Sequence, residues 1–84
     1  MDQMATLIVE NRLPQGVSIE VTRDGAPADP IAAQPGTGPG IALEPGAYTF
    51  TAPGLPKDTA SGAVEPGRNY KIVLDGTGIS FGSK

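Results

Sequence analysis

The sequence predicts an all-β protein, a small antiparallel β-sandwich of about six to seven short strands. Three observations predict this fold class: short segments alternate apolar and polar residues, turn signals separate them about every ten residues, and glycine and proline are abundant. The 84 residues include 12 Gly and 9 Pro, which are unfavourable inside helices. Because a chain of this length can bury one core only, a second domain is excluded.

The first two expected strands are Ala5–Asn11 and Val17–Arg23. The former is a run of aliphatic and β-branched residues, and Leu13–Gly16 after it contains the Pro and Gly of a tight connection. The latter alternates strictly between apolar and polar residues, which is typical of a half-buried strand. Asp24-Gly25 then favours a reversal of the chain, so a hairpin or corner is expected here.

The stretch 26–40 is expected to be a Gly/Pro-rich loop. Proline and glycine interrupt it repeatedly, and no helical stripe of apolar residues is present. Ile31 is its only large apolar residue apart from the flanking strands. We expect Ile31 to pin the loop to the core as a short edge strand.

Two further strands are expected in the second half, at Ala47–Ala52 and Asn69–Asp75, and Thr59–Val64 leads to Glu65-Pro66-Gly67 before the second of them. Both strands alternate aromatic or aliphatic residues with polar ones. Ile79 and Phe81 follow a Gly-Thr-Gly segment and form a final short strand or tail.

The segments Glu44-Pro45-Gly46 and Glu65-Pro66-Gly67 repeat one pattern, each shortly before a tyrosine on an alternating strand. Proline at the first corner and glycine at the second fit a type II turn. Two copies of a hairpin turn therefore explain the repeat, and a duplicated binding site is the alternative.

These segments predict a flexible N-terminus at 1–4 and a single sandwich domain at 5–84, with the loop at 26–40. Its core is expected to contain the inward apolar residues of every strand, with the last two at a margin. They are Leu7, Val9, Val17, Ile19, Val21, Ile41, Leu43, Tyr48, Phe50, Val64, Tyr70, Ile72, Leu74, Ile79 and Phe81.

The arrangement resembles the PEGA domain and its relatives among the carboxypeptidase-regulatory-like and transthyretin-like sandwiches. The matching features are the alternating run Gly16–Val21 before Asp24-Gly25, the segment Leu43–Gly54 with its Pro-Gly turn and aromatic strand, and the closing portion Val64–Leu74. The insertion Gln34–Gly40 departs from the family pattern. The resemblance implies a non-catalytic accessory or surface module, often in bacterial envelope or multidomain proteins, with no catalytic residues to carry over.

The composition excludes most catalytic and metal chemistry. The chain has no His, Cys or Trp, so imidazole bases, thiol nucleophiles, disulfides and soft-metal sites are absent. Its aspartates do not have the spacing of a calcium loop. A net charge of -3 gives no basic surface for nucleic acid. We therefore expect no enzyme, no catalytic residues, no metal and no cofactor.

The expected binding residues are Gln34 and Thr37 in the Gly/Pro-rich loop and Phe81 near the C-terminus. Long irregular segments are often functional, and Phe81 lies beyond a glycine hinge from which it could dock on a neighbour. The loop is not a phosphate cradle, because it lacks the Gly-Lys-Ser/Thr ending and a following helix.

The leading functional hypothesis is a non-catalytic binding or structural module that makes protein–protein contacts through an edge strand or the 26–40 loop. The alternatives are a subunit of a larger assembly, such as a phage decoration or bacterial envelope protein, and a small-molecule or carbohydrate-binding domain. A protein partner or self-association is expected. The sequence shows no signal peptide or membrane span. A soluble chain is expected, either cytoplasmic or, if a signal has been removed, in the cell envelope.

Overall fold

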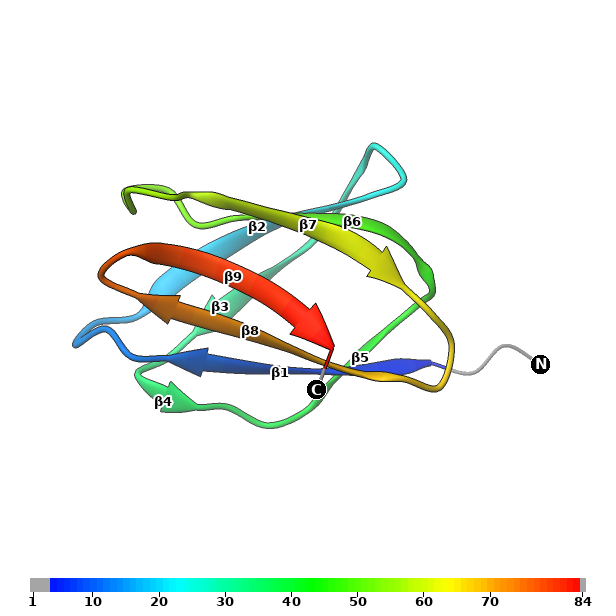
Figure 1. The fold of residues 1–84 in the computed structure, drawn as a ribbon, viewed down its shortest axis with the longest axis horizontal. Helices are drawn as coiled ribbons and strands as arrows, with labels where there is room; N and C mark the ends of the chain where they lie inside the picture. Colours follow the sequence, from blue (N-terminus) through cyan, green and yellow to red (C-terminus); the bar gives the residue numbers. More distant parts are fainter. Residues whose placement is uncertain (1–3, 84) are drawn as a thin grey trace.

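The computed structural model describes residues 4–83, which fold into two β-sheets packed face to face (Figure 1). The predicted all-β sandwich is confirmed. Residues 4–83 contain nine strands, because short segments add to the sheet edges beyond the alternating runs. Of the segment 1–4, expected to be flexible, residues 1–3 lie outside the described residues and Met4 is exposed. The described part contains no helix long and apolar enough to cross a membrane.

Sheet A has five strands, in the order β4, β1, β8, β9, with β5 also paired to β1. Their bounds are β1 (Ala5–Asn11), β4 (Gly36–Thr37), β5 (Ile41–Leu43), β8 (Asn69–Asp75) and β9 (Gly78–Ser83). β1 and β8 are parallel, with Leu7 opposite Tyr70 and Val9 opposite Ile72. The other pairs of sheet A are antiparallel. Because side chains alternate between the two faces, this register places both apolar sets on the inner face.

Sheet B has four antiparallel strands, in the order β3, β2, β6, β7. Their bounds are β2 (Val17–Arg23), β3 (Ala26–Ala33), β6 (Gly46–Thr51) and β7 (Thr59–Val64). Val21 lies opposite Phe50, so the alternating residues of β2 and β6 face the same interior. In Figure 1, β7 of this sheet lies alongside β9 of sheet A, where the two sheets approach each other.

The structure corrects one local expectation, because residues 26–33 form a strand rather than a loop. Pro27 and Pro30 are compatible with it because β3 is an edge strand, where a missing N–H need not break the ladder. Between the pairs Ile19/Ile31 and Val21/Ala28, β2 has one residue and β3 has two, which is a β-bulge. Ile31 is buried on this edge, as expected.

The core lies between the sheets and closely follows the predicted alternation. Val17 and Ile41 are half-buried rather than fully buried, whereas Ile79, expected at a margin, is completely buried. Small residues complete the packing where the sheets come close. The buried apolar residues are Ala5, Leu7, Val9, Ile19, Val21, Ile31, Ala33, Leu43, Tyr48, Phe50, Ala52, Val64, Tyr70, Ile72, Leu74 and Ile79.

Four aromatic rings connect the two sheets in a continuous row. Tyr48 stacks on Phe50 with ring centroids 5.6 Å apart, and Phe50 lies 5.0 Å from Phe81 of the opposite sheet. Phe81 in turn stacks on Tyr70 at 5.3 Å. A Cβ atom at Gly62 would lie 2.7 Å from the Phe81 ring, so glycine at that position leaves the space that the ring occupies.

Candidate functional site

A hollow lies where the sandwich opens between the edge strands β3 and β5. Its volume is about 650 Å³. Most of its wall consists of small and aliphatic residues, and charged residues lie at its rim. The lining residues are Met4, Val21, Arg23, Ala26, Pro27, Ala28, Asp29, Pro30, Ile31, Ala32, Ile41, Ala42, Leu43, Glu44 and Tyr48. We call this hollow the edge cavity.

A polar cluster forms one end of the edge cavity. The Nη1 atom of Arg23 lies 3.1 Å from Oε2 of Glu44. Arg23 also donates two hydrogen bonds to the carbonyl oxygen of Pro45, from Nε at 3.0 Å and from Nη2 at 2.7 Å. The Tyr48 hydroxyl donates to the backbone carbonyl oxygen of Glu44 at 2.7 Å. The guanidinium and the carboxylate are therefore held side by side.

The local sequence explains why these groups meet. Arg23 ends β2 directly before the Asp24-Gly25 turn, and Glu44 precedes Pro45-Gly46. Asp24, at φ 52°, accepts a hydrogen bond from the Ala47 N–H at 2.9 Å and joins the two turns. A Cβ atom at Gly46 would lie 2.9 Å from the Nε atom of Arg23, so only glycine leaves room for the arginine.

The cluster combines groups with complementary chemistry. Three of the five N–H groups of Arg23 account for the contacts with Pro45 and Glu44, which leaves two to donate to a bound oxygen atom. Glu44 is 62% exposed in its side chain, so its carboxylate is open to water. Burial raises the pKa of Tyr48, so its hydroxyl remains a proton donor to the Glu44 backbone. An oxygen-binding cation therefore lies next to a base that can contact water.

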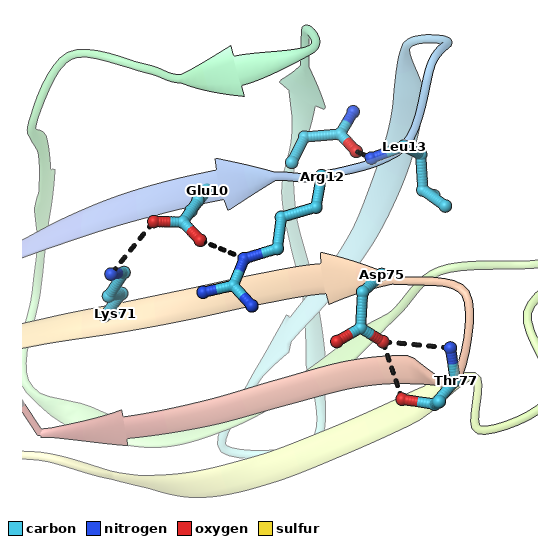
Figure 2. A network of polar contacts seen from close by, with 7 residues as sticks. Glu10, Arg12, Leu13, Lys71, Asp75 and Thr77 are labelled. Atoms are coloured by element: carbon cyan, nitrogen blue, oxygen red, sulfur yellow. Dashed lines mark hydrogen bonds and ion pairs between the residues drawn. The ribbon is translucent and has the colours of Figure 1, made fainter.

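A second polar network lies on the outer face of sheet A (Figure 2). Glu10 of β1 pairs with Arg12, which follows the end of the strand, and with the Nζ atom of Lys71 on β8 at 3.1 Å. Hydrogen bonds from Arg12 and then Lys71 lower the pKa of Glu10. Glu10, Arg12 and Lys71 are paired with one another and line none of the hollows described for residues 4–83. We therefore interpret the network as a structural link between the neighbouring strands β1 and β8.

Asp75 closes the β8–β9 hairpin in the same view (Figure 2). Its Oδ1 atom accepts hydrogen bonds from the Thr77 hydroxyl at 2.6 Å, the Thr77 N–H at 2.9 Å and the Gly78 N–H at 3.2 Å. The two bonds from Thr77 are the main reason that the pKa of Asp75 falls below its usual 3.8. A folded-state pKa below the unfolded value means that the carboxylate stabilises the fold above about pH 3.8, and that this contribution is lost as the pH falls through the lower folded-state pKa.

The Asp75→Asn variant is therefore expected to show a smaller fall in unfolding free energy than the wild type between pH 5 and pH 2. Asparagine retains the accepting oxygen but cannot be protonated in this range. Glu10 contributes with the same sign, so some pH dependence remains. Urea unfolding across this range measures the slope, and Thr77→Ser, which keeps both donors, serves as the control. If the unfolding free energy of Asp75→Asn fell with pH as steeply as that of the wild type, the stabilising role of the Asp75 carboxylate would be contradicted.

The structure does not bring the three predicted binding residues into one site. Gln34 lines a small hollow beside β1, and Thr37 is exposed on β4 opposite Glu10. Phe81 is half-buried, with its ring against Phe50. Their binding role stays a prediction. In residues 4–83, no three acidic side chains are placed together to hold a metal ion.

Sequence reasoning missed the Arg23–Glu44 cluster. It interpreted Glu44-Pro45-Gly46 and Glu65-Pro66-Gly67 as two hairpin turns, which is wrong, because each segment joins strands of different sheets, β5 to β6 and β7 to β8. It also did not consider that Glu44 would face Arg23. The sequence does offer one signal for this pair, because a charged residue stands directly before each of two turn segments. Arg23 precedes Asp24-Gly25, and Glu44 precedes Pro45-Gly46. The sequence alone could not show that these reversals lie at the same end of the sandwich.

Comparison with known proteins supports the fold. No family model matches the chain, and no curated protein matches it in sequence. Among solved structures, the 5-hydroxyisourate hydrolase of Klebsiella pneumoniae is similar, with a TM-score of 0.55, 16% sequence identity and 98% of each chain covered. This likeness agrees with the expected transthyretin-like sandwich. The narrower resemblance to the PEGA domain stays a prediction.

The comparison also corrects the functional expectation. The sequence predicts a non-catalytic binding or structural module and not an enzyme, partly because a sandwich this small offers little space for an active-site cleft. An enzyme whose chain shares this fold over 98% of its length contradicts that expectation. The expectation rested on the absence of His and Cys, which removes most catalytic mechanisms, and gave little weight to carboxylates and guanidinium groups, which can also act on carbonyl compounds.

Proposed function

We propose that the chain is a hydrolase that cleaves small neutral carbonyl compounds, such as esters or cyclic amides, bound in the edge cavity. The observation that carries the proposal is the Arg23–Glu44 pair, 3.1 Å apart on the wall of this cavity. The similar fold of a 5-hydroxyisourate hydrolase supports it.

In the proposed reaction, Arg23 donates hydrogen bonds to the carbonyl oxygen and stabilises the negative charge that develops there. Glu44 accepts a proton from a water molecule as the water oxygen attacks the carbonyl carbon. The bond from that carbon to the leaving atom then breaks, and the proton on Glu44 passes to the leaving atom. An ester gives a carboxylic acid and an alcohol, whereas a cyclic amide opens to one product that carries both a carboxylic acid and an amine.

Tyr48 and Pro45 support this chemistry by holding the reacting groups in place. The Tyr48 hydroxyl fixes the backbone of Glu44, and the Pro45 carbonyl holds two N–H groups of Arg23. Both contacts reduce the freedom of the reacting groups, so fewer conformations must be given up when a substrate binds.

Turnover by the purified chain tests the proposal. The panel contains 5-hydroxyisourate, the compound in the name of the similar enzyme, together with p-nitrophenyl esters and a cyclic imide. We expect hydrolysis of at least one member above its uncatalysed rate, and a decrease of about a hundredfold in kcat for Glu44→Gln.

The chain offers a matched control in its other Glu-Pro-Gly segment. Glu65 is also 62% exposed in its side chain and also pairs with an arginine, Arg68, at 2.8 Å, but it does not line the edge cavity. Glu65→Gln is expected to keep wild-type kcat. Absence of acceleration for every compound, or equal activity of Glu44→Gln and wild type, would overturn the proposal.

A further inference from the structure

The edge cavity lies beside a second hollow of about 140 Å³. Ile31, Ala32 and Ile41 line both hollows, and we call the two together the slot between β3 and β5. From Ala28 to Ala32 the slot follows β3, including its β-bulge. The polar cluster lies at the end lined by Arg23 and Glu44.

The character of the wall changes along this slot. Arg23 and Glu44 lie at one end. Beyond them the half-buried Ala28 and Ile41 and the buried Ile31 line the slot, together with the exposed Asp29, Pro30 and Ala32 of β3. Removing an aliphatic chain from water against such a wall is favourable in proportion to the area covered. The slot therefore fits a molecule with a polar head and an unbranched apolar tail.

The charges of the lining favour a head without a negative charge. Arg23 contributes +1, and Asp29 and Glu44 each contribute -1, which gives -1 for the lining. Arg23 is already paired with Glu44, so a free carboxylate would meet an excess of negative charge. The carbonyl oxygen of a neutral ester or amide can accept hydrogen bonds from the remaining N–H groups of Arg23 without this repulsion.

We infer that the substrates are neutral esters or amides of unbranched aliphatic acids, whose tail lies in the slot along Ala28, Ile31 and Ile41. This inference rests on the proposed hydrolase function for the reaction at the carbonyl group. It adds the substrate class, which the slot determines independently of the chemistry at Glu44.

Chain-length dependence of ester hydrolysis provides the kinetic test. For p-nitrophenyl esters from acetate to octanoate, corrected for uncatalysed hydrolysis, kcat/KM is expected to rise about two- to fourfold per methylene group. Ile41→Ser should flatten this rise. Ile8→Ser is the matched control, because Ile8 is also half-buried on a strand of sheet A but does not line the slot. This control should keep the wild-type dependence.

Binding of neutral ketones separates the slot from the reaction. The methyl signals of Ile31 and Ile41 are expected to shift in NMR spectra on addition of 2-decanone, and much less with 2-butanone at the same concentration. Shifts without hydrolysis of any ester would support the slot and overturn the hydrolase function. Hydrolysis that is independent of chain length, or the absence of shifts at both isoleucines, would overturn the slot and leave the hydrolase function standing.

Discussion

Phe50→Ala is expected to lower the free energy of unfolding by about 3 to 5 kcal/mol, which is the range found when a fully buried phenylalanine is truncated. Phe50 has no exposed surface, and its ring lies between Tyr48 of its own strand and Phe81 of the opposite sheet. Its removal therefore costs apolar burial and leaves a cavity between the two sheets. It also breaks the aromatic row at its centre.

Because small domains are stable by only about 5 to 15 kcal/mol, this variant should be largely unfolded in urea concentrations that the wild type tolerates. Urea titration followed by circular dichroism measures the change. Thr49→Ala, one residue earlier and facing the other side of the sheet, should cost less than about 1 kcal/mol. Similar losses for the two variants would show that the interior is not where the structure places it.

Asn11→Leu is expected to cost about 3 kcal/mol or more, although it replaces a polar residue in the interior with an apolar one. Asn11 is 2% exposed. Its Nδ2 donates to the carbonyl oxygens of Gln15 at 3.0 Å and Ala33 at 2.9 Å, and its Oδ1 accepts from the Leu13 N–H at 2.9 Å. Leucine would leave these three backbone groups without their partner, and each costs about 1 to 3 kcal/mol if it stays buried.

Asn69→Leu is the control, because Asn69 is exposed on β8. The same chemical change there leaves no buried backbone group without a hydrogen-bond partner. Thermal unfolding of the two variants gives the comparison. We expect a clear decrease in Tm for the change at Asn11 and little change at Asn69. An Asn11→Leu variant as stable as the wild type would contradict a structural role for this amide.

The alternating strands could be predicted from the sequence because their physical cause is local. In β2 and β8 every second residue is apolar, and the structure buries most of these residues. The two sheets, the parallel pairing of β1 with β8 and the position of β3 depend on contacts between distant segments. Pro27 and Pro30 concealed β3, because their effect on a strand differs between an edge and the centre of a sheet.

The polar groups were harder to predict than the apolar ones. Asn11 ends a strand in the sequence and resembles an ordinary turn residue, but the fold places it beside the carbonyl oxygen of Ala33, 22 residues away. Arg23 and Glu44 are likewise separated in sequence and joined by two reversals at the same end of the molecule. Alternation specifies which side of a strand is buried, but it does not specify which strand ends meet.

The measurement that tests the account most directly is the position of a bound carbonyl group. In NMR spectra of the wild type, the guanidinium signals of Arg23, identified by their loss in Arg23→Lys, are expected to shift as 2-decanone is added, while those of Arg68 remain unchanged. Shifts confined to residues away from Arg23 would contradict a carbonyl-binding site at the end of the edge cavity.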